Sequence, residues 1–211
     1  AGDLDLACER FSEAYSLLFD HASLLSLINM KLKLGEAELA AATYAKMLDA
    51  GGHLLNAGES RRLVEKLDEA RSLHARARSI LCAPQAALLN SAADREKSHR
   101  RLVDKAKGCC AQKEWDEAER LFLEAWPLTF RVTTLISAAN MMIHGSGPQL
   151  RLAISIYSAL LRNASPRLGR SPLSADEEAI VQRKLAEAKA AICRDARSEH
   201  AVRRLQAVQR G

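Results

Sequence analysis

The side chains best suited to catalysis or metal binding in this 211-residue sequence are six histidines and five cysteines. A zinc site needs such ligands at short spacings, as in C-x-x-C or H-E-x-x-H, and a serine hydrolase needs a nucleophile motif such as G-x-S-x-G. None of these motifs occurs, and apart from the neighbours Cys109 and Cys110 the histidines and cysteines are spread singly. The sequence therefore predicts a protein that is not an enzyme and uses no metal, cofactor or small-molecule substrate.

Two short segments come closest to a chemical site. Gly145-Ser-Gly-Pro148 precedes an expected helix with Arg151 in its first turn, where backbone N–H groups and a cation could hold an anion. It lacks the Lys-Ser/Thr pair of a nucleotide site, so a plain turn is the favoured interpretation. Cys109 and Cys110 point about 100° apart on a helix, which suits packing better than joint ligation. An odd set of five cysteines is typical of buried, reduced thiols.

Uneven charge offers a stronger indication of binding. The formal net charge is +5, and residues 183–211, with eight basic and three acidic residues, account for all of it. A second excess of five positive charges lies at 59–110. Such blocks suit contacts with phosphates, which give affinity and salt dependence without sequence reading, although a solvated arginine-rich face is the alternative interpretation. The candidate residues for binding RNA or an acidic partner are Lys97, Arg100, Arg101, Lys105, Lys107, Arg197, Arg203, Arg204 and Arg210.

The elements that must position these residues are expected to be helices. The chain has 37 alanines and only nine aromatic residues, and its apolar residues recur every three or four positions. The longest uncharged stretch, Val132 to Leu150, is interrupted by Asn140, His144 and Pro148, so we expect no membrane-spanning helix. Ser174 and Glu177 form a capping box that starts the last helix. Helices are expected at about 3–19, 21–34, 36–50, 59–82, 84–93, 96–112, 114–126, 130–143, 149–163 and 175–198.

The sequence also contains an internal repeat. A small residue is followed four positions later by an aromatic ring and after three more by a small or apolar residue, an arrangement that places all three on one helix face. The small residues are separated by 33, 78 and 35 positions, close to one, two and one units of about 34 residues. The four examples are Ala7/Phe11/Ala14, Ala40/Tyr44/Met47, Ala118/Phe122/Ala125 and Ala153/Tyr157/Leu160.

Residues 22–51 resemble a pentatricopeptide repeat. Leu27-Ile28 lies in the first helix, Gly35 at the turn, Ala40 and Tyr44 in the second helix, and Met47 comes before a closing glycine. Thr134-Leu-Ile136 matches the same first-helix start, and residues 97–165 resemble the family less closely. Residues 114–125 fit the tetratricopeptide repeat equally well, whereas 52–95 and the C-terminal helix match neither family. The resemblance implies an all-α fold, an α-solenoid of antiparallel helical hairpins with a long C-terminal helix.

The sequence differs from a regular array of pentatricopeptide repeats in several places. Ile136 and Ala153 are 17 residues apart, against 12 between Ile28 and Ala40, which predicts an insertion at the turn of the later unit. We expect a repeat array over 1–173, degenerate at about 52–95, followed by a basic C-terminal helix and tail over 174–211. Residues 2–14 match the second helix of a unit, so we expect the native protein to continue upstream or to begin its array with a single helix.

The resemblance implies a binding or scaffold subunit of an organellar ribonucleoprotein, in a mitochondrion or plastid; the residues themselves indicate only an intracellular soluble protein. Pentatricopeptide proteins read bases through polar residues early in the first helix and at the end of each unit. The matching places fall near Leu25, Leu55, Val103 and Thr133, which are mostly apolar. We therefore expect contact with the RNA phosphate backbone rather than base reading. The alternative is a tetratricopeptide-like scaffold that binds other protein subunits without touching RNA.

Overall fold

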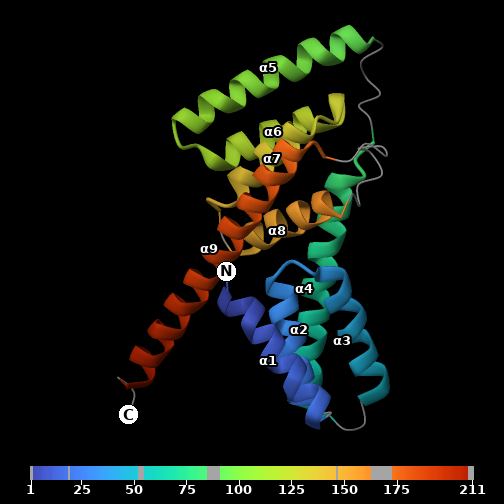
Figure 1. Ribbon diagram of the computed structural model, residues 1–211, viewed down its shortest axis with the longest axis vertical. Helices are drawn as coiled ribbons and strands as arrows, with labels where there is room; N and C mark the ends of the chain where they lie inside the picture. Colours follow the sequence, from blue (N-terminus) through green and yellow to red (C-terminus); the bar gives the residue numbers. More distant parts are fainter. Residues whose placement is uncertain are drawn as a thin grey trace. The chain divides into compact units, whose positions relative to one another are not determined.

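The computed structural model describes residues 2–18, 20–51, 55–84, 91–145, 147–162 and 173–208, and every regular element among them is an α-helix (Figure 1). The prediction of an all-α protein is confirmed. The helices are α1 (Gly2–Leu18), α2 (His21–Lys33), α3 (Ala37–Gly51), α4 (Ala57–Leu81), α5 (Ala92–Ala111), α6 (Trp115–Thr129), α7 (Val132–Met142), α8 (Gly147–Leu161) and α9 (Ala175–Val208).

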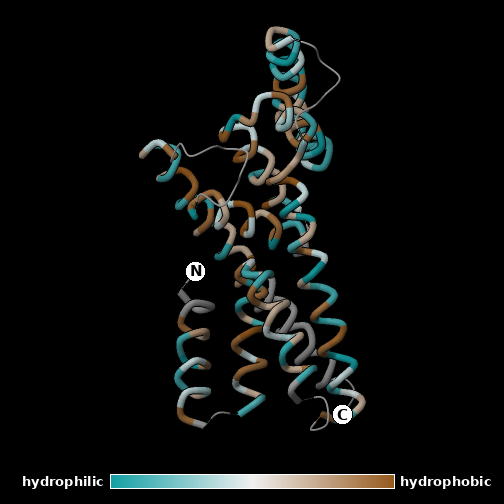
Figure 2. Tube along the Cα trace, turned by 90° about the vertical axis from the view of Figure 1, so that its right-hand side faces the viewer, coloured by the Kyte–Doolittle hydropathy of each residue, from teal (hydrophilic) through white to brown (hydrophobic). Residues whose placement is uncertain are grey.

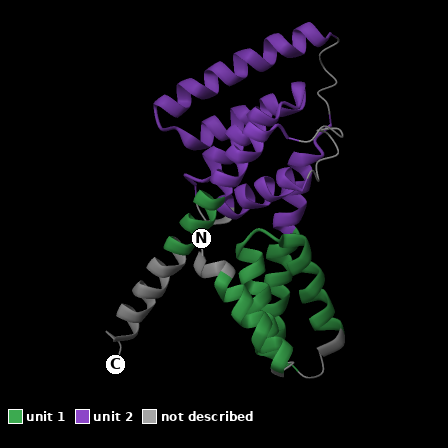
Figure 3. Ribbon diagram, viewed as in Figure 1, with its two compact units in different colours: residues 1–71, 186–211 green, residues 72–185 purple. Residues whose placement is uncertain are grey.

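The chain forms two compact units (Figure 3). The first contains residues 1–71 and 186–211, and the second contains residues 72–185. Helices α4 and α9 each contribute residues to both units. The predicted division at residues 173 and 174 stays a prediction. Figure 2 shows hydrophilic and hydrophobic residues alternating along the helices, as expected for helices with one buried and one exposed face.

Most expected helix boundaries agree with the structure to within a few residues. The capping box of α9 is confirmed: the Ser174 backbone N–H donates to Glu177 Oε2 at 3.0 Å, and the Glu177 N–H donates to Ser174 Oγ at 3.3 Å. The helix expected at 84–93 is wrong at both ends, because Pro84 is not helical and Ser91 is the N-cap of α5; its centre lies outside the described residues. Helix α9 extends to Val208 rather than ending near 198.

In the first unit, α1 packs on α2 and α2 packs on α3. The core residues of α2 are Ile28 and Leu32, and those of α3 include Ala40 and Tyr44, whose side chains have no solvent exposure. The phenol of Tyr44 is satisfied internally, because its hydroxyl donates to Asn29 Oδ1 at 2.8 Å. Burial raises the pKa of Tyr44 to about 12, so the hydroxyl remains a donor throughout the neutral range.

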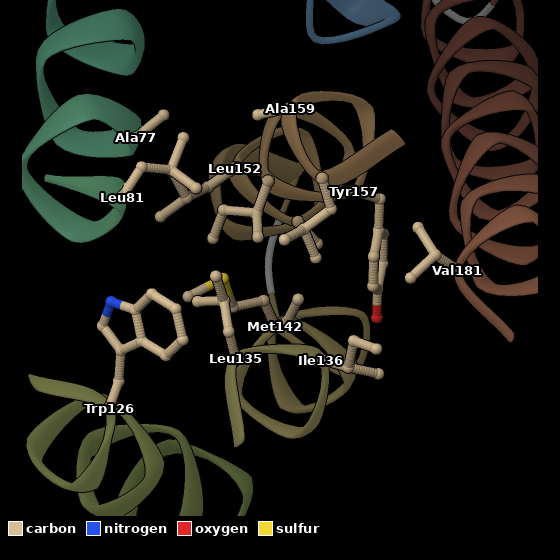
Figure 4. Packing of buried hydrophobic residues seen from close by; sticks show 14 residues of the cluster. Ala77, Leu81, Trp126, Leu135, Ile136, Met142, Leu152, Tyr157, Ala159 and Val181 are labelled. Carbon is tan, nitrogen blue, oxygen red and sulfur yellow. The ribbon is translucent and has the colours of Figure 1, made fainter. Parts of the chain in front are cut away.

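The main core of the second unit lies among α6, α7, α8 and the parts of α4 and α9 that belong to this unit (Figure 4). Tyr157 of α8 lies between Ile136 of α7 and Val181 of α9. Trp126 is 1% exposed, and its Nε1 donates to the Ile80 carbonyl at 2.9 Å. The same carbonyl, in the last turn of α4, also accepts from the Ala83 backbone N–H at 3.3 Å, so the indole adds a second hydrogen bond at this helix end.

A smaller core joins α5 to α6 and α7, with Ala106, Cys109, Ala118 and Phe122 as buried members. All five cysteines are free thiols; Cys8, Cys109 and Cys193 are buried, whereas Cys82 and Cys110 are half-buried. Cys110 Sγ lies 3.3 Å from Met141 Sδ of α7. Both neighbouring thiols thus contact other helices of this core.

The same turn connects α2 to α3 and α5 to α6. Gly35 has a φ of 77° and Lys113 a φ of 62°, and each lies five residues before the buried alanine of the following helix. In both turns the left-handed residue donates to a carbonyl three residues back, and the next residue donates to a carbonyl five residues back at 3.0 Å. This bonding pattern is the Schellman motif. The sequence equivalence of Lys113 with Gly35 is thus reproduced in backbone geometry, with a lysine where glycine is favoured.

The hydrogen bond of Tyr44 also recurs, since the Tyr157 hydroxyl of α8 donates to Asn140 Oδ1 of α7 at 2.8 Å. The two bonds make Asn140 the equivalent of Asn29, 17 and 15 residues before their tyrosines. The predicted insertion stays a prediction: counted from Ile136 and Ile28 the later segment is longer by five residues, and counted from Asn140 and Asn29 it is longer by two. The later unit has two extra residues between its paired side chains.

Candidate nucleic-acid interface on α5

Helix α5 places all five basic residues expected in the middle of the chain on its solvent face. Ser91 starts the helix, since its Oγ accepts from the Asp94 backbone N–H at 3.0 Å. His99, Ala106 and Cys109 lie on the opposite, buried face. The exposed candidates are Lys97, Arg100, Arg101, Lys105 and Lys107.

The exposed face of α5 is positively charged. Against the five cations it exposes only two carboxylates, Asp94 and Asp104, so that five minus two leaves a charge of +3. Three cations are paired with carboxylates: Arg100 with Glu96 at 2.8 Å, Lys105 with Glu117 at 3.8 Å and Lys107 with Asp104 at 3.8 Å.

Lys97 and Arg101 form no ion pair with any residue that the structure describes. With Lys105 they make a row at every fourth residue, so successive cations rise by about 6 Å along the helix. A row of this kind presents charge along one line, which suits a linear polyanion better than a single anion.

Two polar contacts hold α5 against α7. Arg131, the N-cap of α7, pairs with Glu96 at 2.9 Å, and His99 Nε2 lies 2.8 Å from Thr134 Oγ1. The hydrogen bond from Arg100, helped by the charge of Arg131, lowers the pKa of Glu96. Burial and the nearby Arg131 cation lower the pKa of His99, which favours its neutral form. The charged face is thereby fixed to a packed helix rather than to a free segment.

Gly108 lies on the same exposed face, near the C-terminal end of α5. A β-carbon built at this position would meet nothing within 4 Å. Packing therefore does not require glycine here, although glycine weakens a helix by about 0.5–1 kcal/mol relative to alanine.

The remaining candidates lie near the C-terminus. Arg197, Arg203 and Arg204 belong to α9, whose side chains the structure describes only as far as Arg194, and Arg210 lies outside the described residues. The five candidates of α5 belong to the second compact unit, whereas the four C-terminal candidates belong to the first. Within the described residues no group of three or more His, Cys, Asp and Glu is placed to hold a metal. None of the described helices is both long enough and apolar enough to cross a bilayer.

Comparison with protein families, curated proteins and solved structures finds no match for this chain. The sites must therefore be judged from their own geometry.

Sequence reasoning did not anticipate an open pocket at the turns of the second unit. It lies beside the stacked rings of Trp115 at the start of α6 and His144 after α7, which are 29 residues apart in the chain. The sequence analysis treated His144 as one of six scattered histidines and the residues after it as a turn. Only the similar positions of Trp115 and His144, each beside an expected turn, could have signalled their contact.

Proposed function

We propose that this protein is a non-enzymatic helical-repeat protein of the pentatricopeptide or tetratricopeptide type. Two repeated details support a solenoid of helical hairpins: the left-handed turns at Gly35 and Lys113, and the part-buried tyrosine–asparagine bonds of Tyr44 and Tyr157. Each compact unit contains one such turn and one such hydrogen bond, and both details join two consecutive helices. Repeats of this kind stack to form extended binding surfaces.

We further propose that the protein binds RNA through the phosphate backbone, along the exposed face of α5. The observation that carries this proposal is the row formed by Lys97, Arg101 and Lys105 on a face with a charge of +3. The exposed residues of this helix include no aromatic side chain on which a base could stack. Val103, which occupies a base-reading place of the pentatricopeptide family, is apolar and half-buried. Binding without base reading follows from both features.

The cationic end of α9 is the second contact in this proposal, because residues 183–211 carry a charge of +5. Two basic blocks in one chain suit a long single strand or a folded RNA better than a short oligonucleotide. By family resemblance, the proposed setting is a ribonucleoprotein of a mitochondrion or plastid, in which the protein acts as a binding or scaffold subunit.

A specific observation favours a second candidate, a scaffold that binds only other proteins. Arg100, Lys105 and Lys107 are already paired with carboxylates of the chain, which reduces the charge left for phosphates. Binding of RNA at low salt distinguishes the two functions, because a protein scaffold has no need of it.

The test is binding of fluorescein-labelled oligo(U) RNA, followed by fluorescence anisotropy at about 50 and 200 mM salt. For three phosphate contacts on a single strand, we expect affinity to fall by about 20-fold between these concentrations. The variant Lys97→Gln/Arg101→Gln should bind more weakly at the lower salt. Arg61→Gln/Arg62→Gln removes two exposed cations of α4 and is the matched control.

The variant Arg203→Gln/Arg204→Gln measures how much the C-terminal basic block contributes to the affinity for RNA. Weaker binding by this variant and by the α5 variant would support contact at both blocks. Absence of binding by the wild-type protein at the lower salt would refute the RNA proposal and favour the protein scaffold. Equal weakening by the α4 control would show that net charge alone, rather than the α5 face, determines affinity.

A further inference from the structure

An open pocket of about 870 Å³ lies where the turn between α5 and α6 meets the turn between α7 and α8. It is separate from the row of cations on α5, although Glu117 on its wall pairs with Lys105. The residues that line it are Lys113, Glu114, Trp115, Asp116, Glu117, His144, Gly145 and Gln149.

One wall of the pocket is aromatic. The rings of Trp115 and His144 are stacked, with centroids 4.2 Å apart and an angle of 17° between their planes. His144 is exposed, so the pair presents a flat surface to solvent beside the pocket. A β-carbon at Gly145 would collide with the Gln149 side chain, so the glycine allows the glutamine amide to lie close to the loop. Both turns contribute to the same recess.

The charged side chains around the pocket are mostly acidic, three carboxylates against Lys113. Glu117 is already neutralised, because Arg120 lies 2.6 Å away, Lys105 lies 3.8 Å away, and the hydrogen bond from Arg120 lowers the pKa of Glu117. Glu114 and Asp116 are exposed and form no ion pair with any described residue. Glu114 accepts a hydrogen bond from the Cys109 thiol, which leaves the charge of the carboxylate unpaired. Two carboxylates without an ion pair to any described residue therefore lie beside the aromatic wall.

We propose that this pocket binds an arginine side chain of a partner protein. A guanidinium group is planar and cationic, so it stacks on an aromatic ring and pairs with carboxylates through a fork of N–H donors. The Trp115–His144 surface and the carboxylates of Glu114 and Asp116 match these two properties. A lysine ammonium lacks the plane, and a nucleotide would bring its phosphate towards the carboxylates. This proposal is additional to RNA binding, because it gives the protein a separate site for a protein partner.

The experiment is a titration of the ¹⁵N-labelled full chain with the peptide acetyl-Gly-Arg-Gly-amide, followed by NMR of the two tryptophan indole N–H groups. Trp126 is buried and donates to Ile80, so its signal is an internal reference, while the signal of Trp115 reports the pocket. Trp115→Phe assigns the two signals. The peptide with citrulline in place of arginine is the matched ligand, because citrulline keeps the planar group but has no charge.

We expect the arginine peptide to shift the Trp115 signal to saturation and leave that of Trp126 unchanged. The variant Glu114→Gln/Asp116→Asn should raise the dissociation constant about fivefold or more. As a control, Glu65→Gln/Asp68→Asn removes one glutamate and one aspartate charge from exposed positions of α4. This variant should leave the dissociation constant of the arginine peptide unchanged.

Three results would overturn the proposal. The first is no shift of Trp115 at any soluble concentration of the arginine peptide. The second is equal binding of the citrulline peptide, which would show that charge is not recognised. The third is a stronger effect of uridine monophosphate than of the arginine peptide, which would make the pocket a nucleotide site. None of these results depends on whether RNA binds to α5, because that binding is measured separately with oligo(U).

Discussion

Lys113→Gly should stabilise the protein although it removes a side chain. Lys113 has a φ of 62°, in the left-handed region where a β-carbon is strained, and it occupies the place that Gly35 has in the equivalent turn. The strain costs a non-glycine residue about 1–2 kcal/mol. Glycine returns about 0.5–1 kcal/mol of this through its greater freedom in the unfolded chain. The expected net gain in the free energy of unfolding is about 0.5–1 kcal/mol.

Urea unfolding followed by tryptophan fluorescence measures this gain, because both tryptophans lie in α6, the helix that follows the turn. Lys113→Ala is the control: it removes the same charge and most of the side chain but keeps the strained β-carbon. We expect Lys113→Gly to be more stable than Lys113→Ala by about 0.5–1 kcal/mol. Equal stability of the two variants, or a lower stability of the glycine variant, would refute the assignment of a strained turn at this position.

Four other substitutions test three separate details of the fold. Tyr44→Phe and Tyr157→Phe should each lower the free energy of unfolding by about 1 kcal/mol, measured by circular dichroism in urea, since each breaks one part-buried hydrogen bond; no loss in either would contradict their equivalence. Gly108→Ala should raise thermal stability by about 0.5–1 kcal/mol, because its β-carbon meets nothing, and a decrease would mean that the helix surface is not open there. Burial lowers the pKa of His99 below 6.5, so the unfolded chain binds a proton that the folded chain does not, and stability should fall as pH is lowered through 6.5. His99→Gln should lose less stability between about pH 7 and pH 5 than the wild type, and parallel losses would assign the pH dependence to other groups.

The buried face of several helices could be predicted from the sequence, where small and aromatic residues recur four positions apart. Ala40, Ala118 and Ala153 have no exposure, and the rings four residues after them are buried. Composition and periodicity predicted the all-α class, because alanine and apolar residues at spacings of three and four favour helices and little in the chain favours strands. The set formed by Ala7, Phe11 and Ala14 is less completely buried, since Ala7 and Phe11 are only half-buried.

Alignment of the repeats is ambiguous where several apolar residues have similar spacing. Ile136 and Ile28 look equivalent in the sequence, whereas the hydrogen bonds to tyrosine give Asn140 and Asn29 the same role in the structure. A hydrogen bond between two helices depends on how they pack, and the pattern within one helix does not contain that information. Polar residues on an otherwise apolar helix face are a second guide to the alignment.

The sequence predicted which residues of the candidate interface are charged, but it did not predict the ion pair between α5 and α6. Lys105 and Glu117 are 12 residues apart and meet at 3.8 Å only because α5 packs on α6. The stacking of Trp115 on His144 likewise depends on two turns from different helix pairs lying together. Contacts between elements depend on tertiary packing, so neither the pocket nor the Lys105–Glu117 pair could be predicted from sequence. The pairs Arg100–Glu96 and Lys107–Asp104 lie within α5 at spacings of four and three residues, which sequence does predict.

The salt dependence of RNA binding tests the central claim most directly. The slope of log affinity against log salt concentration reports how many phosphates the protein contacts, at about 0.7 per phosphate for a single strand. If Lys97 and Arg101 each contact a phosphate, Lys97→Gln/Arg101→Gln should bind oligo(U) with a slope shallower than that of the wild type by about 1.4. An unchanged slope in this variant would contradict phosphate contact by the exposed face of α5.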